Sequence, residues 1–361
     1  MILFLVCIMI AALCPCACAE SPDSTLVFEF ADEHGSGELV RAVYDAAMDG
    51  RTSAWTELMN WAKREMLLPL ERVMKTALGL LVPLMLLTMV RACMAEGKGG
   101  SEGARFLLHM LLLLGFSDLA VLALAATENC IHSVKDFTDA VSPGIAAILA
   151  SMGMNGMASL VSPAAALTGG IAEGIFLKYG LRLCKLALCS AIAGNLSEII
   201  DLSRFTALLK KTANWGTGLA STLFTALVAL QGSVTEVLDS VGVRTAKFAA
   251  DSAAPIIGNG VSDAWDSFIT GIMMTKNALG MSSIAALLSA GLQPMLSCMA
   301  AMLSLHLIAA LLELFGERET ARAAEQIGGI CQMALSLSTG ALVITAVLLG
   351  AAMAAGKNFF A

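Results

Sequence analysis

The chain has 361 residues, of which 57% are hydrophobic and only 14% are charged, and its formal net charge is −7. Soluble domains carry about 25% charged residues, and runs such as TALGLLVPLMLLTMV leave almost no face for water. We therefore expect an all-α, polytopic helical membrane protein and not a soluble helical one. Lys and Arg are nowhere dense enough for a nucleic-acid interface.

The first residues, MILFLVCIMIAALCPCACAE, predict a secretory signal peptide over 1–19. An apolar core is followed by Ala-Cys-Ala ending at Ala19, which fits the small-residue cleavage motif, so Glu20 is the expected mature start. The usual positive start is missing because the first cation is Arg41, and the alternative is an uncleaved anchor. Cleavage would place residues 20–75 outside the cytoplasm.

Residues 20–75 form a polar N-terminal region that we expect to be small, helical and extracytoplasmic. Trp55, Met59 and Met66 fall on one helical face, which predicts an amphipathic helix. This helix suits a membrane surface, and it equally suits packing within a small soluble domain.

Two membrane bundles are expected, at 76–232 and 268–361, on either side of a polar segment at 233–267. Apolar runs of roughly 20 residues predict spans, at about 76–95, 106–126, 142–161, 164–180, 181–200, 214–231, 268–291, 292–314 and 330–355. The 142–200 stretch reads either as three spans or as two spans and a re-entrant pair, so we expect about seven true spans. The pairs Ser142-Pro143 and Ser162-Pro163 predict helix starts.

Ionisable residues inside apolar runs are candidate functional groups, because they are costly in hydrocarbon. The residues of this kind are His109, Asp118, Glu173, Lys276, His306 and Glu313. Lys276 and Glu313 lie near predicted span ends, where their charges can reach the membrane surface, so we interpret both as ordinary edge residues. Our candidates are Asp118 and above all Glu173, which lies between Gly170 and Gly174, a spacing that predicts close helix approach. Glu173 either lines a polar path, or belongs to a loop if 164–180 does not cross the membrane.

The sequence contains no nucleophile elbow, no phosphate-binding loop and no zinc-protease motif, and its ten cysteines include no CxxC pair. We expect no catalytic residues, no metal ligands and no cofactor, and we do not expect an enzyme. The cysteines in apolar helices are interpreted as small buried hydrophobes.

The polar segment includes VGVRTAKFAADSAAPIIGNGVSDAWDSF at residues 241–268. Its apolar residues recur at helical spacing on both sides of a break, which predicts a pair of short amphipathic helices lying at the membrane surface. The expected hinge residues are Pro255, Gly258 and Gly260.

Four residues of this segment are candidates for docking a partner: Arg244, Lys247, Phe248 and Trp265. Arg244 and Lys247 are three apart, so they share one helical face and can hold lipid phosphates or a partner's carboxylates. The plainer interpretation is that both are cations marking the edge of a helix.

Four features of this region stand out together: QG at 231–232, RTAKF, the PIIG turn, and KNALGM leading into an apolar run. With these features the region resembles the most characteristic part of the stage III sporulation protein AE family. The specific resemblance covers about 60 residues, and the layout of signal peptide, polar region and multi-span body agrees over nearly the whole chain.

The resemblance implies a membrane subunit of the sporulation channel complex that links mother cell and forespore, supporting forespore development and late gene expression. It implies a multi-pass protein of the mother-cell membrane around the forespore. The implied partners are other membrane subunits of the stage III complex, an associated ATPase and channel proteins made in the forespore, with membrane lipid around the subunit. The alternative is a stand-alone secondary transporter of a small solute, which the sparse and unpaired intramembrane charge disfavours.

We expect N-terminal sequencing of the membrane-extracted protein to give a chain that starts at or near Glu20, since Ala19 fits the requirement for a small residue before the cleaved bond. Recovery of an intact Met1 would identify the segment as an anchor.

Overall fold

A computed structural model describes residues 24–33, 36–48, 59–61, 75, 79, 101–151, 154–196, 202–253, 258–314 and 316–354, with backbone alone for 231–253, 258–277 and some residues at helix ends. The regular structure in these residues is entirely helical, as expected. Ala19, Glu20, Trp55 and almost all of the expected span 76–95 lie outside the described residues.

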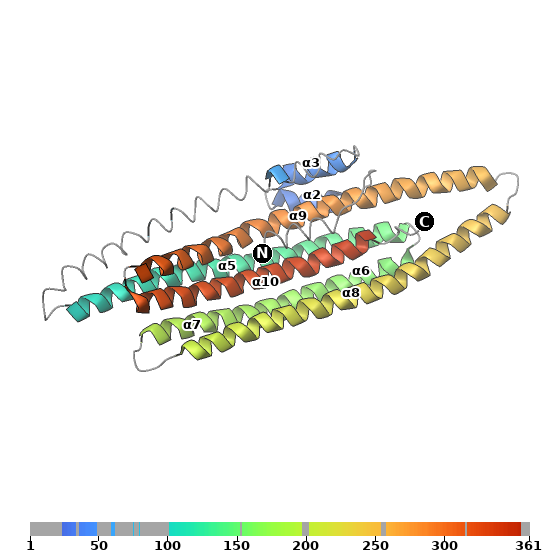
Figure 1. Ribbon diagram of the computed structural model, residues 1–361. Helices are drawn as coiled ribbons and strands as arrows, with labels where there is room; N and C mark the ends of the chain where they lie inside the picture. Colours follow the sequence, from blue (N-terminus) through green and yellow to red (C-terminus); the bar gives the residue numbers. More distant parts are fainter. Residues whose placement is uncertain are drawn as a thin grey trace.

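The long helices lie side by side in an elongated bundle (Figure 1). The elements are α2 (Ser24–Glu33), α3 (Gly37–Met48), α5 (Ser101–Ser151), α6 (Asn155–Ile171), the π-helix η1 (Ala172–Leu181), α7 (Arg182–Leu196), α8 (Ser203–Ala253), α9 (Gly258–Leu314) and α10 (Arg318–Ala354). Because α6, η1 and α7 follow one another without a gap, they form one helical run from 155 to 196.

Four helical stretches of the described chain are long and apolar enough to cross a membrane. They are His109–Ser151, Asn155–Leu196, Ala278–Leu314 and Arg318–Met353. The protein is therefore a helical membrane protein, whereas the expected count of about seven spans is not confirmed. Helix α8, which contains the expected span 214–231, is not among the four.

Both expected helix starts at Ser-Pro pairs are wrong. Pro143 lies inside α5 and Pro163 lies inside α6. A proline inside a membrane helix is tolerated when neighbouring helices and local adjustments compensate for its missing N–H. The helices change instead between Ser151, where α5 ends, and Asn155, where α6 begins.

Helix α5 is too long for the hydrocarbon layer. Its 51 residues extend about 76 Å at 1.5 Å per residue, whereas the layer is about 30 Å thick. Residues 106–127 contain only two ionisable side chains, but 128–139 contain five. The first of these stretches therefore suits hydrocarbon and the second suits water.

The N-terminal hairpin of α2 and α3 packs against the charged part of α5 and against α9. The ring of Phe30 meets Phe137 of α5 edge-on, with centroids 5.2 Å apart, and Ser289 Oγ of α9 donates a hydrogen bond to Ser36 Oγ at 2.8 Å. The outer residues of the hairpin are polar, which favours water on that side of the contact.

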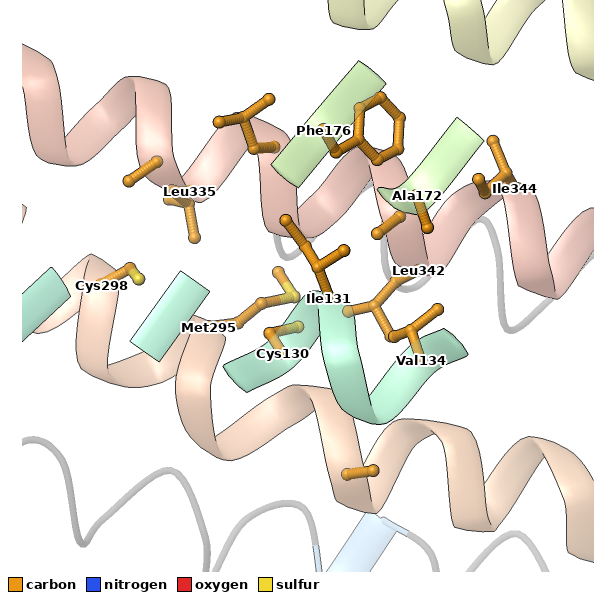
Figure 2. Close-up of a cluster of buried hydrophobic side chains, with 14 of the residues drawn as sticks. Cys130, Ile131, Val134, Ala172, Phe176, Met295, Cys298, Leu335, Leu342 and Ile344 are labelled. Carbon is orange, nitrogen blue, oxygen red and sulfur yellow. The ribbon is translucent and has the colours of Figure 1, made fainter. Parts of the chain in front are cut away.

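One continuous core joins helices of the two expected bundles. Figure 2 shows Cys130 and Ile131 of α5 beside Met295 and Cys298 of α9, with residues of η1 and α10 closing the cluster. The cysteines of this core, Cys130, Cys184, Cys298 and Cys331, are free and buried. Their burial agrees with the interpretation from sequence as small buried residues, whereas Cys189 of α7 is exposed and departs from it.

The two short interfacial helices expected over 233–267 are not separate elements. The first part continues α8 as far as Ala253, and the second part is the beginning of α9 at Gly258. Figure 1 shows the end of α8 and the start of α9 extending together beyond the end of α10. We call residues 231–253 and 258–277 the α8–α9 arm.

Close helix packing uses different glycines from those expected. A Cβ atom at Gly170 or Gly174 would meet nothing within 4 Å, so the expected close approach at these residues is wrong. At Gly340 of α10, a Cβ would lie 2.8 Å from Thr217 Cγ2 and 3.3 Å from Phe176 Cζ. Gly340 thus lets α10 approach α8 and η1 at once.

We expect Gly340→Ala to lower the stability of the solubilised protein by about 1–3 kcal/mol, because the added methyl overpacks a contact with two buried side chains. The matched change Gly170→Ala should be neutral or stabilising, since Ala favours helix over Gly by about 1 kcal/mol and the site is open. Thermal unfolding followed by size-exclusion chromatography measures both. Equal melting temperatures for the two variants would contradict the packing.

Candidate functional site

The carboxylate of Glu173 lies between two lysines on the surface where η1 meets α5. Lys135 Nζ of α5 donates to Glu173 Oε2 at 3.0 Å, and Lys178 Nζ of η1 lies 2.9 Å from Glu173 Oε1. We call these three residues the Glu173 cluster. Their side chains are 32–56% exposed, so water reaches the charges.

The π-helix brings Glu173 and Lys178 together. Side chains three or four apart are neighbours on an α-helix, but these two residues are five apart. The i→i+5 hydrogen bonding of a π-helix places residues five apart one above the other. The helical geometry of Ala172–Leu181 therefore creates the second ion pair of Glu173, and π segments of this kind occur frequently at functional sites.

A third ion pair continues the charged surface towards α7. Lys185 Nζ donates to Glu128 Oε2 of α5 at 3.0 Å. Together with the Glu173 cluster it forms a charged face along α5, η1 and α7. Exposed pairs of this kind contribute little to stability because solvent screens them, so this face is better suited to water or to another chain than to holding the bundle together.

Glu173 is a helical residue and does not lie in a loop. Its cluster lies at the same level of α5 as the N-terminal hairpin but on a different face, since Phe137, which touches Phe30, is two residues from Lys135. The arrangement gives a water-exposed carboxylate held by two ammonium groups. Such a group can orient a charged partner or a passing ion.

A separate polar network ties four helices together at the opposite end of α5, and sequence analysis missed most of it. His109 Nδ1 lies 3.0 Å from Thr320 Oγ1 of α10, and its Nε2 lies 3.3 Å from the Asn195 carbonyl oxygen of α7. Asn195 Nδ2 donates to Gln326 Oε1 at 3.1 Å, and Lys210 Nζ of α8 donates to the Gln326 carbonyl at 3.1 Å. Only His109 had been singled out, because the other members are ordinary polar residues at helix ends.

Asp118, the second intramembrane candidate, is far from the Glu173 cluster along α5. It is exposed, 17 residues before Lys135 on the same helix. Within the described part of the chain its carboxylate forms no hydrogen bond or ion pair. The structure therefore does not join the two intramembrane candidates into one site.

The candidate docking residues lie in the α8–α9 arm. Arg244, Lys247 and Phe248 belong to α8, and Trp265 belongs to α9. Of the expected hinge residues, Gly258 is the first residue of α9 and Gly260 follows in its first turn, while Pro255 lies outside the described residues. The roles of these residues in docking and bending remain predictions.

No group of three or more His, Cys, Asp or Glu side chains comes together as a metal site within the part of the chain that the structure describes. The charged face pairs acids with lysines, and positively charged ligands are absent from metal sites of the usual kinds.

Comparison with known proteins gives a family. The model of the family described as stage III sporulation protein AE matches residues 42–356. The chain is 25% identical over 207 residues to stage III sporulation protein AE of Bacillus subtilis (strain 168), which covers 57% of this chain and 52% of that relative. It thus spans about half the length of the relative, and no solved structure matches. Because the family match extends over most of the sequence, this chain belongs to the stage III sporulation protein AE family.

Proposed function

We propose that this sporulation protein is a membrane subunit of the channel complex that links the mother cell and the forespore, located in the mother-cell membrane around the forespore. The observation that carries the proposal is the division of α5 into an apolar stretch at 106–127 and a charged stretch at 128–139. One helix thus anchors the protein in the bilayer and carries a charged surface beyond it.

The surface beyond the bilayer supports a role in assembly. The charged face holds five paired charged side chains that are 32–56% exposed, and the N-terminal hairpin packs on another face of α5 at the same level. Charged and polar groups on such a surface favour specific association by electrostatic complementarity. A transporter acting alone has no evident need for this extended surface.

The α8–α9 arm supplies a second surface for partners in this proposal. It carries Arg244 and Lys247, which are three apart on one helix. In this arrangement the two cations hold acidic groups of another subunit of the complex. The subunit itself performs no catalytic step, and an associated ATPase supplies any energy that the complex uses.

We expect the full-length protein from sporulating cells to co-purify with other membrane proteins of the complex, and Arg244→Glu/Lys247→Glu to lose them. Reversing both charges repels an acidic docking site, while the four apolar helical stretches are unchanged, so membrane levels should remain normal and spore formation should fail. The control Arg244→Lys/Lys247→Arg keeps both charges and should behave as wild type. Co-purification is measured from solubilised membranes and function as heat-resistant spores.

Two results would count against this view. If the double Glu variant keeps its partners and sporulates, the α8–α9 arm only connects the two helices and does not dock a partner. Solute uptake by the wild-type protein alone in liposomes, with no partner retained from cells, would favour the stand-alone transporter.

Replacing Glu173 tests the charged face. We expect Glu173→Gln to keep the protein level but to reduce spore formation strongly, because Lys135 and Lys178 lose their shared counter-charge and the face changes its net charge. The same substitution at Glu313, an exposed residue near the end of α9, should have little effect. If Glu173→Gln gives normal spore counts at a normal protein level, the Glu173 cluster is not needed for function.

A further inference from the structure

The outer face of α5 is apolar along its first half. Leu107, Leu111, Leu114, Val121 and Leu122 are 54–69% exposed. Leu107, Leu111 and Leu114 are four and three residues apart, and Val121 follows Leu114 by seven residues, which is two helical turns, so these residues lie on one helical face with Leu122 beside Val121. We call this face the α5 stripe. It belongs to the part of α5 that suits hydrocarbon.

Asp118 lies in the middle of the α5 stripe. It follows Leu114 by four residues and precedes Val121 by three, and it is exposed like its neighbours. No other described residue pairs with its carboxylate. A lone carboxylate facing lipid tails is costly, and acids within spanning segments usually pair with a cation or another polar group.

Two possible occupants of the stripe do not supply a partner for Asp118. A second copy that presented the same face would bring two Asp118 carboxylates together, and like charges repel. The expected span 76–95 has no charged, amide or hydroxyl side chain between Thr76 and Thr88. Its middle therefore offers no donor at the depth of Asp118, which lies near the middle of the expected span 106–126.

We propose that the α5 stripe docks a membrane-spanning helix of another protein that carries a Lys or Arg at mid-depth, paired with Asp118. Leu114 and Val121 would flank the ion pair and exclude lipid and water from it. A cation in hydrocarbon is also costly, so each helix gains its counter-charge only in the complex, which makes the contact selective. The inference rests on the proposed function in that it requires a membrane partner.

The first test is Asp118→Leu in the full-length protein in sporulating cells. If Asp118 faced lipid, Leu would be neutral or favourable there, since it continues the apolar stripe. With a basic partner helix, Leu leaves the cation unpaired in hydrocarbon, and we expect roughly a tenfold or larger loss of the co-purified partner and of heat-resistant spores. Glu313→Leu, which also removes an exposed carboxylate, is the control and should change neither.

Replacing Leu114 with a photo-crosslinking amino acid tests directly whether another protein contacts the α5 stripe. This amino acid should form an adduct with one membrane protein, and Asp118→Leu should abolish that adduct while the protein level stays normal. The chemistry of the partner follows from suppressors of Asp118→Lys. We expect them to replace a Lys or Arg in an apolar segment of the crosslinked protein by Glu or Asp.

The results that would contradict this inference differ from those that would contradict the proposed function. If Asp118→Leu sporulates normally and keeps all partners that the wild type retains, the α5 stripe is a lipid contact and the inference fails while the proposed function stands. If wild-type protein retains no membrane partner at all, the proposed function and this inference fail together. Suppressors that map only within this chain would also overturn the inference, because they would indicate a partner in the same molecule.

Discussion

The thickness of the hydrocarbon layer governs the rest of this structure. A layer of about 30 Å takes roughly 20 residues of helix, whereas α5, α8 and α9 have 51, 51 and 57 residues. Each of these helices must therefore leave the bilayer or lie beyond it over much of its length. On α5 the sequence indicates a change of environment, since five ionisable side chains lie between Glu128 and Asp139. The hairpin and the Glu173 cluster both contact α5 on the polar side of that boundary.

The hydropathy of the sequence was sufficient to predict a helical membrane protein, but it was not sufficient to predict where the helices begin and end. The sequence predicted a break between the spans 106–126 and 142–161, because charges and then a proline follow the first apolar run. The helix continues through both, since a charged stretch needs only water beside it, and Pro143 lies on an exposed face inside α5 without ending the helix. Likewise the polar segment after residue 232 extends α8, because polarity does not interrupt hydrogen bonding along the backbone. Family membership was predictable from short motifs, which do not depend on boundaries.

The candidate site was predictable in part. Glu173 was identified because a carboxylate is conspicuous in an apolar run, but neither of its partners was. Lys135 is 38 residues away and on another helix, and such a pairing depends on tertiary packing that no local pattern contains. Lys178 is close in sequence but out of phase for an α-helix. The prediction of close-packing glycines was wrong for a related reason. Gly340 is a contact point only because α8 and η1 both pack beside α10 in the folded chain.

The π-helix has one consequence for how the chain tolerates changes in length. Consecutive residues of an α-helix differ by about 100° in direction, so adding or removing one residue within Ala172–Leu181 would turn all of α7 by that angle relative to α6. Such a rotation would move Lys185 away from Glu128 and turn Cys184 out of the core. The π-helix thus sets the rotation of α7 relative to α6. Sequences that keep this core must keep the number of residues in the π-helix, even where its residue types change.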